Sequence, residues 1–213
     1  MNTLIITGGT TDKVFIEDYL KSNKFDVIIA ADKGLETLYK LKVMPNYIIG
    51  DFDSIDTKVL KQYENTNIPI TYLKPEKDYT DTHMALKKAI EIGSKEITII
   101  GGIGTRLDHT LANINILKEA LDNNVKAKII NENNEIMLIN NEVTINKNNK
   151  FKYISLLPLT TKVSGITLEG FKYLLYDAAL NIGESIGVSN EQISDLAKIK
   201  IKEGIAILIL SKD

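Results

Sequence analysis

The first 130 residues alternate short apolar runs with segments of helical spacing. The apolar runs contain few polar residues, as in strands buried on both faces of a parallel sheet. This alternation predicts a Rossmann-like α/β domain, a parallel sheet with helices on its faces. The expected strands are Thr3–Thr7, Asp26–Ala31, Tyr47–Ile49, Ile68–Leu73, Glu96–Ile100 and Lys126–Ile130, and the expected helices are Thr10–Ser22, Leu35–Leu41, Thr57–Tyr63, Asp81–Ile92 and Thr110–Leu121.

The pattern changes after about residue 132, where strand-like segments follow one another without helices. This change predicts a second domain, residues 133–213, that is an all-β sandwich or barrel. Ile205–Leu210 is apolar on both faces and is expected to lie centrally, joined to the preceding strand by a hairpin turn at Lys202–Gly204. The other expected strands are Glu135–Ile139, Val143–Ile145, Phe151–Leu157, Ile166–Glu169 and Leu196–Ile201.

The composition narrows the class of protein. The 213 residues are 44% hydrophobic and 25% charged, as in ordinary globular proteins. A net charge of −2 argues against nucleic-acid binding. The absence of cysteine excludes disulfides and thiolate sites and is compatible with a reducing compartment. We expect a cytoplasmic protein with no membrane association, because no signal peptide and no apolar stretch of about 20 residues is present.

Carboxylates and glycines follow nearly every expected strand of the first domain. Asp51 and Asp53 stand after the third strand, in Ile48–Ile55 (IIGDFDSI), where their mutual repulsion would be relieved by Mg²⁺. The alternative for this pair alone is an acid-rich surface turn. Open α/β sheets bind ligands at the edge formed by the carboxyl ends of their strands. The acids and glycines expected at that edge therefore predict one metal–phosphate site. The other strand ends carry Gly8-Gly9, Asp32, Asp78 with Asp81, and Gly101–Asp108.

The segment before the fourth expected helix carries several candidate ligands. Asp78, Thr80 and Asp81 can each cap the helix, but only one of them can do so. The remaining acids are then candidate cation ligands beside Asp51 and Asp53. Lys77 either contacts a phosphate or remains solvated.

The segment Ile100–His109 (IGGIGTRLDH) reads as a strand, a glycine turn and the start of a helix. Backbone N–H groups of Gly101 and Gly102 in such a turn can bind anionic oxygens. Arg106 is a candidate for stabilising phosphoryl charge. Asp108 is either a helix cap or a further site acid, and His109 is a candidate ligand contact.

The two histidines and the lack of cysteine leave little support for thiol or zinc chemistry. Carboxylates, a divalent cation, an arginine and a glycine turn suit in-line phosphoryl transfer. An aspartate-based phosphatase is an alternative enzyme, and a nucleotide-binding sensor without turnover is a non-enzymatic one.

Six segments in order give the chain a resemblance to the thiamine pyrophosphokinase family along nearly its whole length. Lys33 departs from the glycine that the family often has at that position. The segments are Ala30–Gly34 (AADKG), Gly50–Ser54 (GDFDS), Lys77–Asp81 (KDYTD), Gly101–Asn113 (GGIGTRLDHTLAN), Gly165–Tyr173 (GITLEGFKY) and Ser185–Glu191 (SIGVSNE).

The resemblance implies transfer of the diphosphate group of ATP to thiamine, giving thiamine diphosphate and AMP. It also implies a need for Mg²⁺ and a homodimer with sites between the subunits. That attack falls on the β rather than the γ phosphorus comes from the resemblance alone. By position, Asp51, Asp53 and Asp81 look like metal and catalytic acids, and Asp32, Asp78, Arg106 and Asp108 like further nucleotide-site residues.

The second domain resembles the thiamine-binding domain of the family. Tyr173 stands where an aromatic ring can stack on thiamine, a cation with two flat rings. Taken alone, Tyr173 also fits a strand core, and Ser189-Asn190 also fits a turn. The candidate thiamine contacts are Gly165, Tyr173, Ser185, Ser189 and Asn190.

Overall fold

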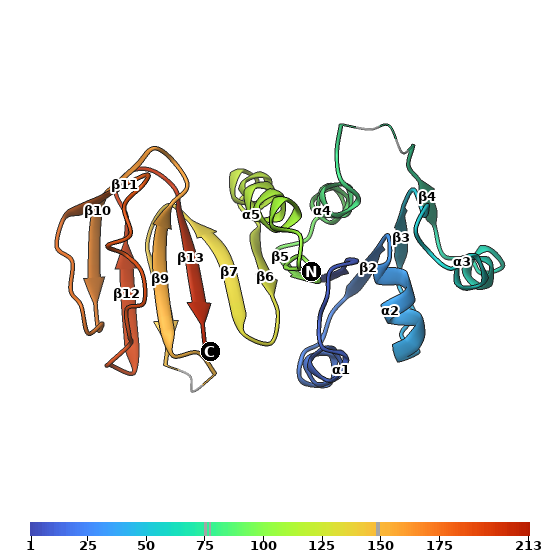
Figure 1. Cartoon of the computed structure of the whole chain (residues 1–213), viewed down its shortest axis with the longest axis horizontal. Helices are drawn as coiled ribbons and strands as arrows, with labels where there is room; N and C mark the ends of the chain where they lie inside the picture. Colours follow the sequence, from blue (N-terminus) through green and yellow to red (C-terminus); the bar gives the residue numbers. More distant parts are fainter. Residues whose placement is uncertain (75, 77, 148–149) are drawn as a thin grey trace. The chain divides into compact units, whose positions relative to one another are not determined.

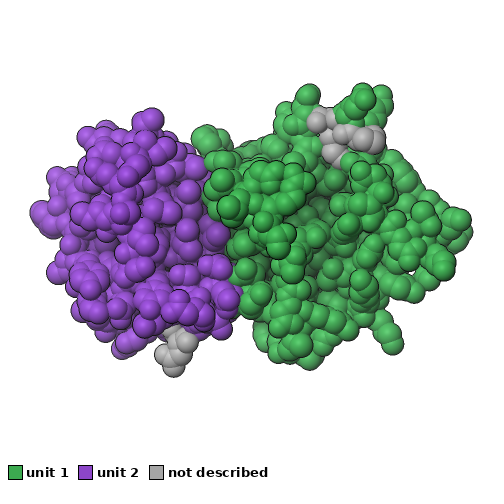
Figure 2. Space-filling model, viewed as in Figure 1, with its two compact units in different colours: residues 1–132 green, residues 133–213 purple. Residues whose placement is uncertain are grey.

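A computed structural model describes residues 1–74, 76, 78–147 and 150–213. The chain forms two compact units, Met1–Glu132 and Asn133–Asp213, coloured separately in Figure 2. Lys77, a candidate phosphate contact in the sequence, lies outside the described residues. Within the described ranges, no helix combines the length and the apolar character needed to cross a membrane.

The first unit is a parallel α/β fold, as expected (Figure 1). Its strands lie in the order β4-β3-β2-β1-β5-β6, and each pairs in parallel with its neighbours. The strands are β1 (Asn2–Ile6), β2 (Val27–Ala31), β3 (Tyr47–Gly50), β4 (Ile70–Tyr72), β5 (Glu96–Ile100) and β6 (Lys126–Ile130), and the helices are α1 (Lys13–Ser22), α2 (Gly34–Leu41), α3 (Thr57–Glu64), α4 (Asp81–Glu91) and α5 (Leu107–Asp122).

Side chains of β1 show how the helices divide between the two faces of this sheet. Leu4 and Ile6 belong to a buried core that also contains residues of α1, α2 and α3. Successive side chains of a strand point to opposite faces, and Thr7, just after β1, contacts Thr82 of α4 through their hydroxyl groups, 2.8 Å apart. α4 therefore covers the other face, where it packs beside α5 (Figure 1).

Helix α1 begins at Lys13, later than the expected start at Thr10. The carboxylate of Asp12 accepts a hydrogen bond from the backbone N–H of Val14 at 2.9 Å and caps the helix there. An N-cap side chain fixes the first turn in this way, so the residues before Asp12 remain outside the helix.

The strand order reverses beside β1, which lies between β2 and β5. The connections that leave β1 and β5 therefore run to opposite faces of the sheet. A crevice at such a switch point is where open α/β sheets bind ligands. The glycine turns after β1 and β5 flank this position.

The second unit is all-β, as expected, and it is a sandwich rather than a barrel. β13 (Ala206–Ser211) pairs antiparallel with β7 (Asn134–Ile139) on one side and β9 (Tyr153–Pro158) on the other. A four-stranded antiparallel sheet has the order β11-β10-β12-β8. Side chains from both groups of strands form one buried core. The bounds of the second sheet are β8 (Val143–Asn146), β10 (Lys162–Glu169), β11 (Ala178–Asn181) and β12 (Leu196–Lys200).

The central position expected for the last strand is confirmed, but the hairpin expected at Lys202–Gly204 is wrong. β12 already has β10 and β8 on its two edges, so β13 cannot pair with it. The turn instead carries the chain between the two groups of strands. Strand β11 was not expected from the sequence, because Leu180 is its only buried side chain.

Candidate active site

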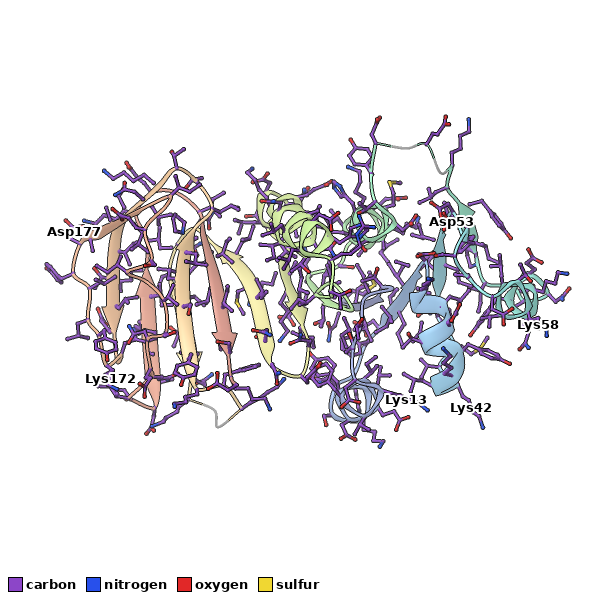
Figure 3. All side chains as sticks on the ribbon, in the orientation of Figure 1. Lys13, Lys42, Asp53, Lys58, Lys172 and Asp177 are labelled. Carbon is purple, nitrogen blue, oxygen red and sulfur yellow. The ribbon has the colours of Figure 1, made fainter. Side chains whose placement is uncertain are left out.

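Three carboxylates from two neighbouring loops meet at the carboxyl edge of the first sheet. Asp32 follows β2, and Asp51 and Asp53 follow β3, where Figure 3 shows Asp53. One carboxylate oxygen from each residue lies within 4.8 Å of the other two. The parallel pairing of β2 with β3 continues past the strands, because the Asp32 N–H donates to the Ile49 carbonyl at 3.0 Å.

The electrostatics of this cluster are unfavourable without a counter-charge. Burial raises the pKa of Asp32, and the charges of Asp81, Asp51 and Asp53 raise it further, against a backbone hydrogen bond from Lys33 that lowers it. The contribution of Asp81 to the raised pKa of Asp32 identifies Asp81 as a fourth acid that interacts electrostatically with Asp32. A divalent cation among these oxygens would remove the repulsion.

Thr80, rather than either aspartate, caps α4. Its hydroxyl accepts a hydrogen bond from the backbone N–H of His83 at 3.2 Å. Asp81 is the first residue of the helix, and Asp78 is exposed. Asp81 is thus not needed as a cap, which leaves it as a candidate ligand.

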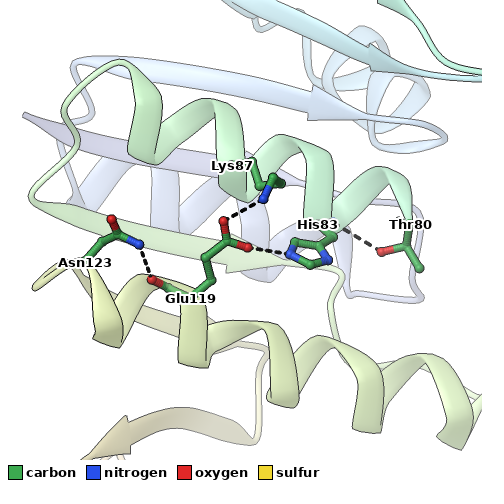
Figure 4. A network of polar contacts seen from close by, with 5 residues as sticks. All are labelled: Thr80, His83, Lys87, Glu119 and Asn123. Atoms are coloured by element: carbon green, nitrogen blue, oxygen red, sulfur yellow. Dashed lines mark hydrogen bonds and ion pairs between the residues drawn. The ribbon is translucent and has the colours of Figure 1, made fainter. Parts of the chain in front are cut away.

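The first turn of α4 is tied to α5 by a network of polar contacts (Figure 4). Glu119 of α5 binds His83 Nε2 at 2.6 Å and Lys87 Nζ at 2.8 Å. Burial acts to raise the pKa of Glu119, but the hydrogen bonds from Lys87 and His83 prevail and lower it. His83 is a partly exposed helix residue, and its contact with Glu119 holds the helix that begins with Asp81.

The glycine turn after β5 depends on close backbone contacts. Gly101 has φ +84°, and a Cβ there would lie 2.3 Å from the Thr7 carbonyl oxygen. The buried amide of Asn113 donates to the Gly102 carbonyl at 2.8 Å and so fixes the turn to α5. Sequence reasoning did not assign a role to Asn113, although an amide on the apolar side of a helix was the available signal.

Arg106 and Asp108 form a two-point ion pair at the start of α5, with Nη2–Oδ2 at 2.6 Å and Nε–Oδ1 at 3.2 Å. The hydrogen bond from Arg106 lowers the pKa of Asp108 to about 2. The N-cap position belongs to Arg106, so the capping interpretation of Asp108 is wrong. His109 is exposed on the same turn.

A second residue that sequence reasoning did not assign is Ser54. Its hydroxyl donates to both oxygens of Asp32, at 3.4 and 3.5 Å, and so joins the loop after β3 to the loop after β2. The serine in Gly50–Ser54 was visible, but only the folded chain shows which carboxylate it faces.

The second unit contains a pocket of about 280 Å³ with mainly apolar walls. Phe171 lies at this pocket, buried, and Tyr173 lies there with 59% of its surface exposed. The strand-core interpretation of Tyr173 is therefore wrong. The remaining described lining residues are Ile154, Leu156, Leu168, Leu174, Leu175, Ile186, Gly187, Val188, Asn190 and Ile199.

Asn190 is a buried clamp for the backbone of Tyr173. Its Oδ1 accepts from the Tyr173 N–H at 3.0 Å, and its Nδ2 donates to the Tyr173 carbonyl at 2.7 Å. Among the described residues, Gly165, Ser185 and Ser189 do not line the pocket. Gly165 lies at a bulge of β10. The backbone N–H of Ser189 donates a hydrogen bond to Ser155 Oγ at 3.0 Å.

Comparison with known proteins matches both units to one family. The family model described as thiamin pyrophosphokinase, catalytic domain, matches residues 18–129, and the model for the vitamin B1 binding domain matches residues 140–206. The thiamine pyrophosphokinase of Bacillus subtilis (strain 168) is 32% identical over 214 residues, which cover 100% of both chains.

Solved structures agree with this match. The crystal structure of the Bacillus subtilis thiamine pyrophosphokinase has a TM-score of 0.90 to this chain, with 100% of both chains covered. The thiamin pyrophosphokinase of Geobacillus thermodenitrificans is 28% identical with a TM-score of 0.88, covering 100% of this chain and 98% of that one.

Proposed function

This chain belongs to the thiamine pyrophosphokinase family, and we propose that it transfers the diphosphate of ATP to thiamine at an Mg²⁺ site on the edge of its first sheet. It is an enzyme of the thiamine pyrophosphokinase type, and the metal, the site residues and the assembly are the proposed parts. The observation that carries the metal site is the meeting of one carboxylate oxygen each from Asp32, Asp51 and Asp53 within 4.8 Å of one another.

The donor set fits Mg²⁺, because hard cations prefer carboxylate oxygens. We assign Asp51, Asp53 and Asp81 as ligands, as the sequence predicted, with Asp32 beside them. Bound Mg²⁺ would neutralise charge on the triphosphate and make its phosphorus a better electrophile. The pKa of Asp32 is raised first by burial and then by the charges of Asp81, Asp51 and Asp53, and a cation at this position would remove the second effect.

The remaining residues of the first unit would bind and orient the nucleotide. The Gly101–Gly102 turn and the start of α5 can donate backbone N–H groups to phosphate oxygens. Arg106, held by Asp108, lies at the same helix start and can contact the triphosphate or the departing AMP. Asp78, Thr80, Asp108 and His109 complete the proposed nucleotide contacts, together with Lys77.

The transfer itself requires one proton acceptor. The hydroxyl oxygen of thiamine forms a bond to the β phosphorus, and the bond from that phosphorus to the bridging oxygen of AMP breaks. Asp53 or Asp81 accepts the hydroxyl proton. Both the electron pair and the charge of the broken bond leave with AMP.

We place thiamine against Tyr173 in the pocket of the second unit. Its rings suit apolar walls and an exposed aromatic face. Lys172 Nζ lies 5.5 Å from the centre of the Tyr173 ring, so the opposite face of the ring is the proposed stacking face. Asn190 lines this pocket, and Gly165, Ser185 and Ser189 are proposed as contacts outside its described lining.

Homodimer formation is the proposed assembly, with sites completed by the second subunit. Exposed apolar side chains around the pocket support it, because isolated proteins seldom expose such a cluster. Leu174 and Ile186 are each 69% exposed there. Sedimentation analysis tests this proposal: a monomer at micromolar concentration would contradict it. Cytoplasmic location belongs to the same proposal and is tested by cell fractionation.

The deciding assay mixes the protein with ATP, Mg²⁺ and thiamine and resolves all products. AMP and thiamine diphosphate appearing in equal amounts are the expected result. ADP with thiamine monophosphate would instead show a simple kinase, and free phosphate would show a phosphatase. Intact ATP, with ligands raising the melting temperature, would show a sensor.

A further inference from the structure

Phe52 has an unusual backbone conformation between the two aspartates that follow β3. Its φ is +60°, in the left-handed region. Bulky side chains rarely adopt this conformation, and where it occurs the surrounding structure must impose it. Phe52 is 8% exposed, so its ring supplies buried contacts that can impose it.

The ring of Phe52 belongs to the core shared by the sheet with α1, α2 and α3. It also meets the Tyr72 ring edge-on, with centroids 5.3 Å apart and an interplanar angle of 82°. Burial of an aromatic ring is strongly favourable, and an edge-to-face contact adds direction. These contacts hold Phe52 toward the core while its neighbours Asp51 and Asp53 extend into the cluster.

Gly50 provides the space that this arrangement needs. A Cβ on Gly50 would lie 2.8 Å from Cε1 of Phe52 and 3.3 Å from Cα of Asp32. The missing side chain therefore lets the Phe52 ring and the Asp32 backbone both contact the end of β3. One glycine thus brings together the two loops that carry the carboxylates.

We propose that Phe52, seated against Gly50, is a positioning residue that sets the spacing of the Asp51 and Asp53 carboxylates and so determines how tightly the cluster binds a divalent cation. This inference rests on the proposed metal site. The Asp53 N–H lies 3.4 Å from Asp51 Oδ1 and closes the short turn around Phe52. If the ring withdraws, the backbone at residue 52 can relax and the two carboxylates separate.

The test measures Mn²⁺ binding to the full chain by electron paramagnetic resonance, without nucleotide. Phe52→Ala and Gly50→Ala are each expected to weaken Mn²⁺ binding at least about tenfold, while Phe52→Leu retains part of the affinity. Ile16→Ala is the matched control, because Ile16 lies in the same core on α1, 3% exposed. It should lower stability to urea but leave Mn²⁺ affinity unchanged.

A double variant tests the contact itself. Gly50→Ala should weaken Mn²⁺ binding less in the Phe52→Leu background than in the wild type, because the smaller side chain makes room for the new methyl group. Equal Mn²⁺ affinities for the wild type, Gly50→Ala and Phe52→Leu would overturn the role of Phe52 but leave the metal site standing. A wild-type chain that binds no Mn²⁺ would overturn the proposed metal site as well. Phe52→Leu and Gly50→Ala keep the test decisive if Phe52→Ala does not fold.

Discussion

The guanidinium of Arg106 holds the carboxylate of Asp108 by two hydrogen bonds, at 2.6 and 3.2 Å, across a single intervening residue. Both side chains are mainly exposed, 68% and 65%, so the pair contributes little to stability. Its effect is to keep Asp108 ionised and the guanidinium oriented at the start of α5. The pair thus holds the positively charged Arg106 side chain next to the glycine turn after β5.

Removal of Arg106 should change the titration of Asp108. In the wild type, we expect a carboxyl pKa of about 2 by carbon-13 NMR, and in Arg106→Gln a return toward the ordinary value. Because the folded-state pKa is lowered, the stabilisation is present above about pH 4 and is lost as the pH falls through about 2. Lys118→Gln is the control: it removes the ion-pair partner of Asp122 on the same helix and should leave the pKa of Asp108 unchanged.

Asp53→Asn should lower turnover at least about 100-fold while the chain remains folded. The variant removes a proposed metal ligand or proton acceptor from an exposed position. Asp56→Asn is the matched control, because Asp56 caps α3 through the Lys58 N–H at 2.9 Å and asparagine caps equally well. Steady-state kinetics and circular dichroism measure both, and normal turnover of Asp53→Asn would contradict the placement of the metal.

Asp32→Asn should stabilise the metal-free chain at neutral pH. The pKa of Asp32 is raised by burial and by Asp81, Asp51 and Asp53. Ionisation of Asp32 therefore costs stability: the contribution of Asp32 to stability is greatest below about pH 4, the unfolded pKa, and is lost as the pH rises through the raised folded-state value.

The measurement is the melting temperature between pH 4 and 8, with EDTA and with Mg²⁺. The excess stability of Asp32→Asn over the wild type should grow with pH in EDTA and shrink in Mg²⁺. Asp18→Asn, an exposed site on α1, is the control and should show neither trend. A wild-type melting temperature that does not respond to Mg²⁺ would count against the cation site.

Tyr173→Ala should raise the KM for thiamine about tenfold or more with little change in kcat, because it removes the proposed stacking surface. Tyr176→Ala is the control: Tyr176 is 89% exposed and lies outside the pocket lining among the described residues. Asn190→Ala should act in the same direction as Tyr173→Ala, since Asn190 holds the Tyr173 backbone. An unchanged KM for thiamine in Tyr173→Ala would place thiamine elsewhere.

Sequence reasoning succeeded where burial alone decides the outcome. The alternation of apolar runs and helical spacing identified every strand of the first unit, and β13, apolar except for Ser211, lies between two partners as expected. Glycine and aspartate after successive parallel strands also led to the carboxyl edge, because parallel strands bring their ends together whatever their order.

Choices between alternative partners were decided only by the tertiary structure. Each of Asp78, Thr80 and Asp81 has a side chain that can cap α4, and Asp108 has one that can cap α5. Which residue occupies the cap position depends on backbone geometry that the sequence does not show. β13 avoids β12 because both edges of β12 are occupied, which periodicity along one strand cannot reveal.

By itself, then, the sequence determined the two classes of fold and the edge at which acids and glycines gather, because hydrophobic periodicity records which residues must be buried. The folded chain alone determined that oxygens of Asp32, Asp51 and Asp53 lie within 4.8 Å of one another and that Phe52 packs against Gly50. Such contacts join residues from different loops and depend on distances of a few ångströms that only close packing sets.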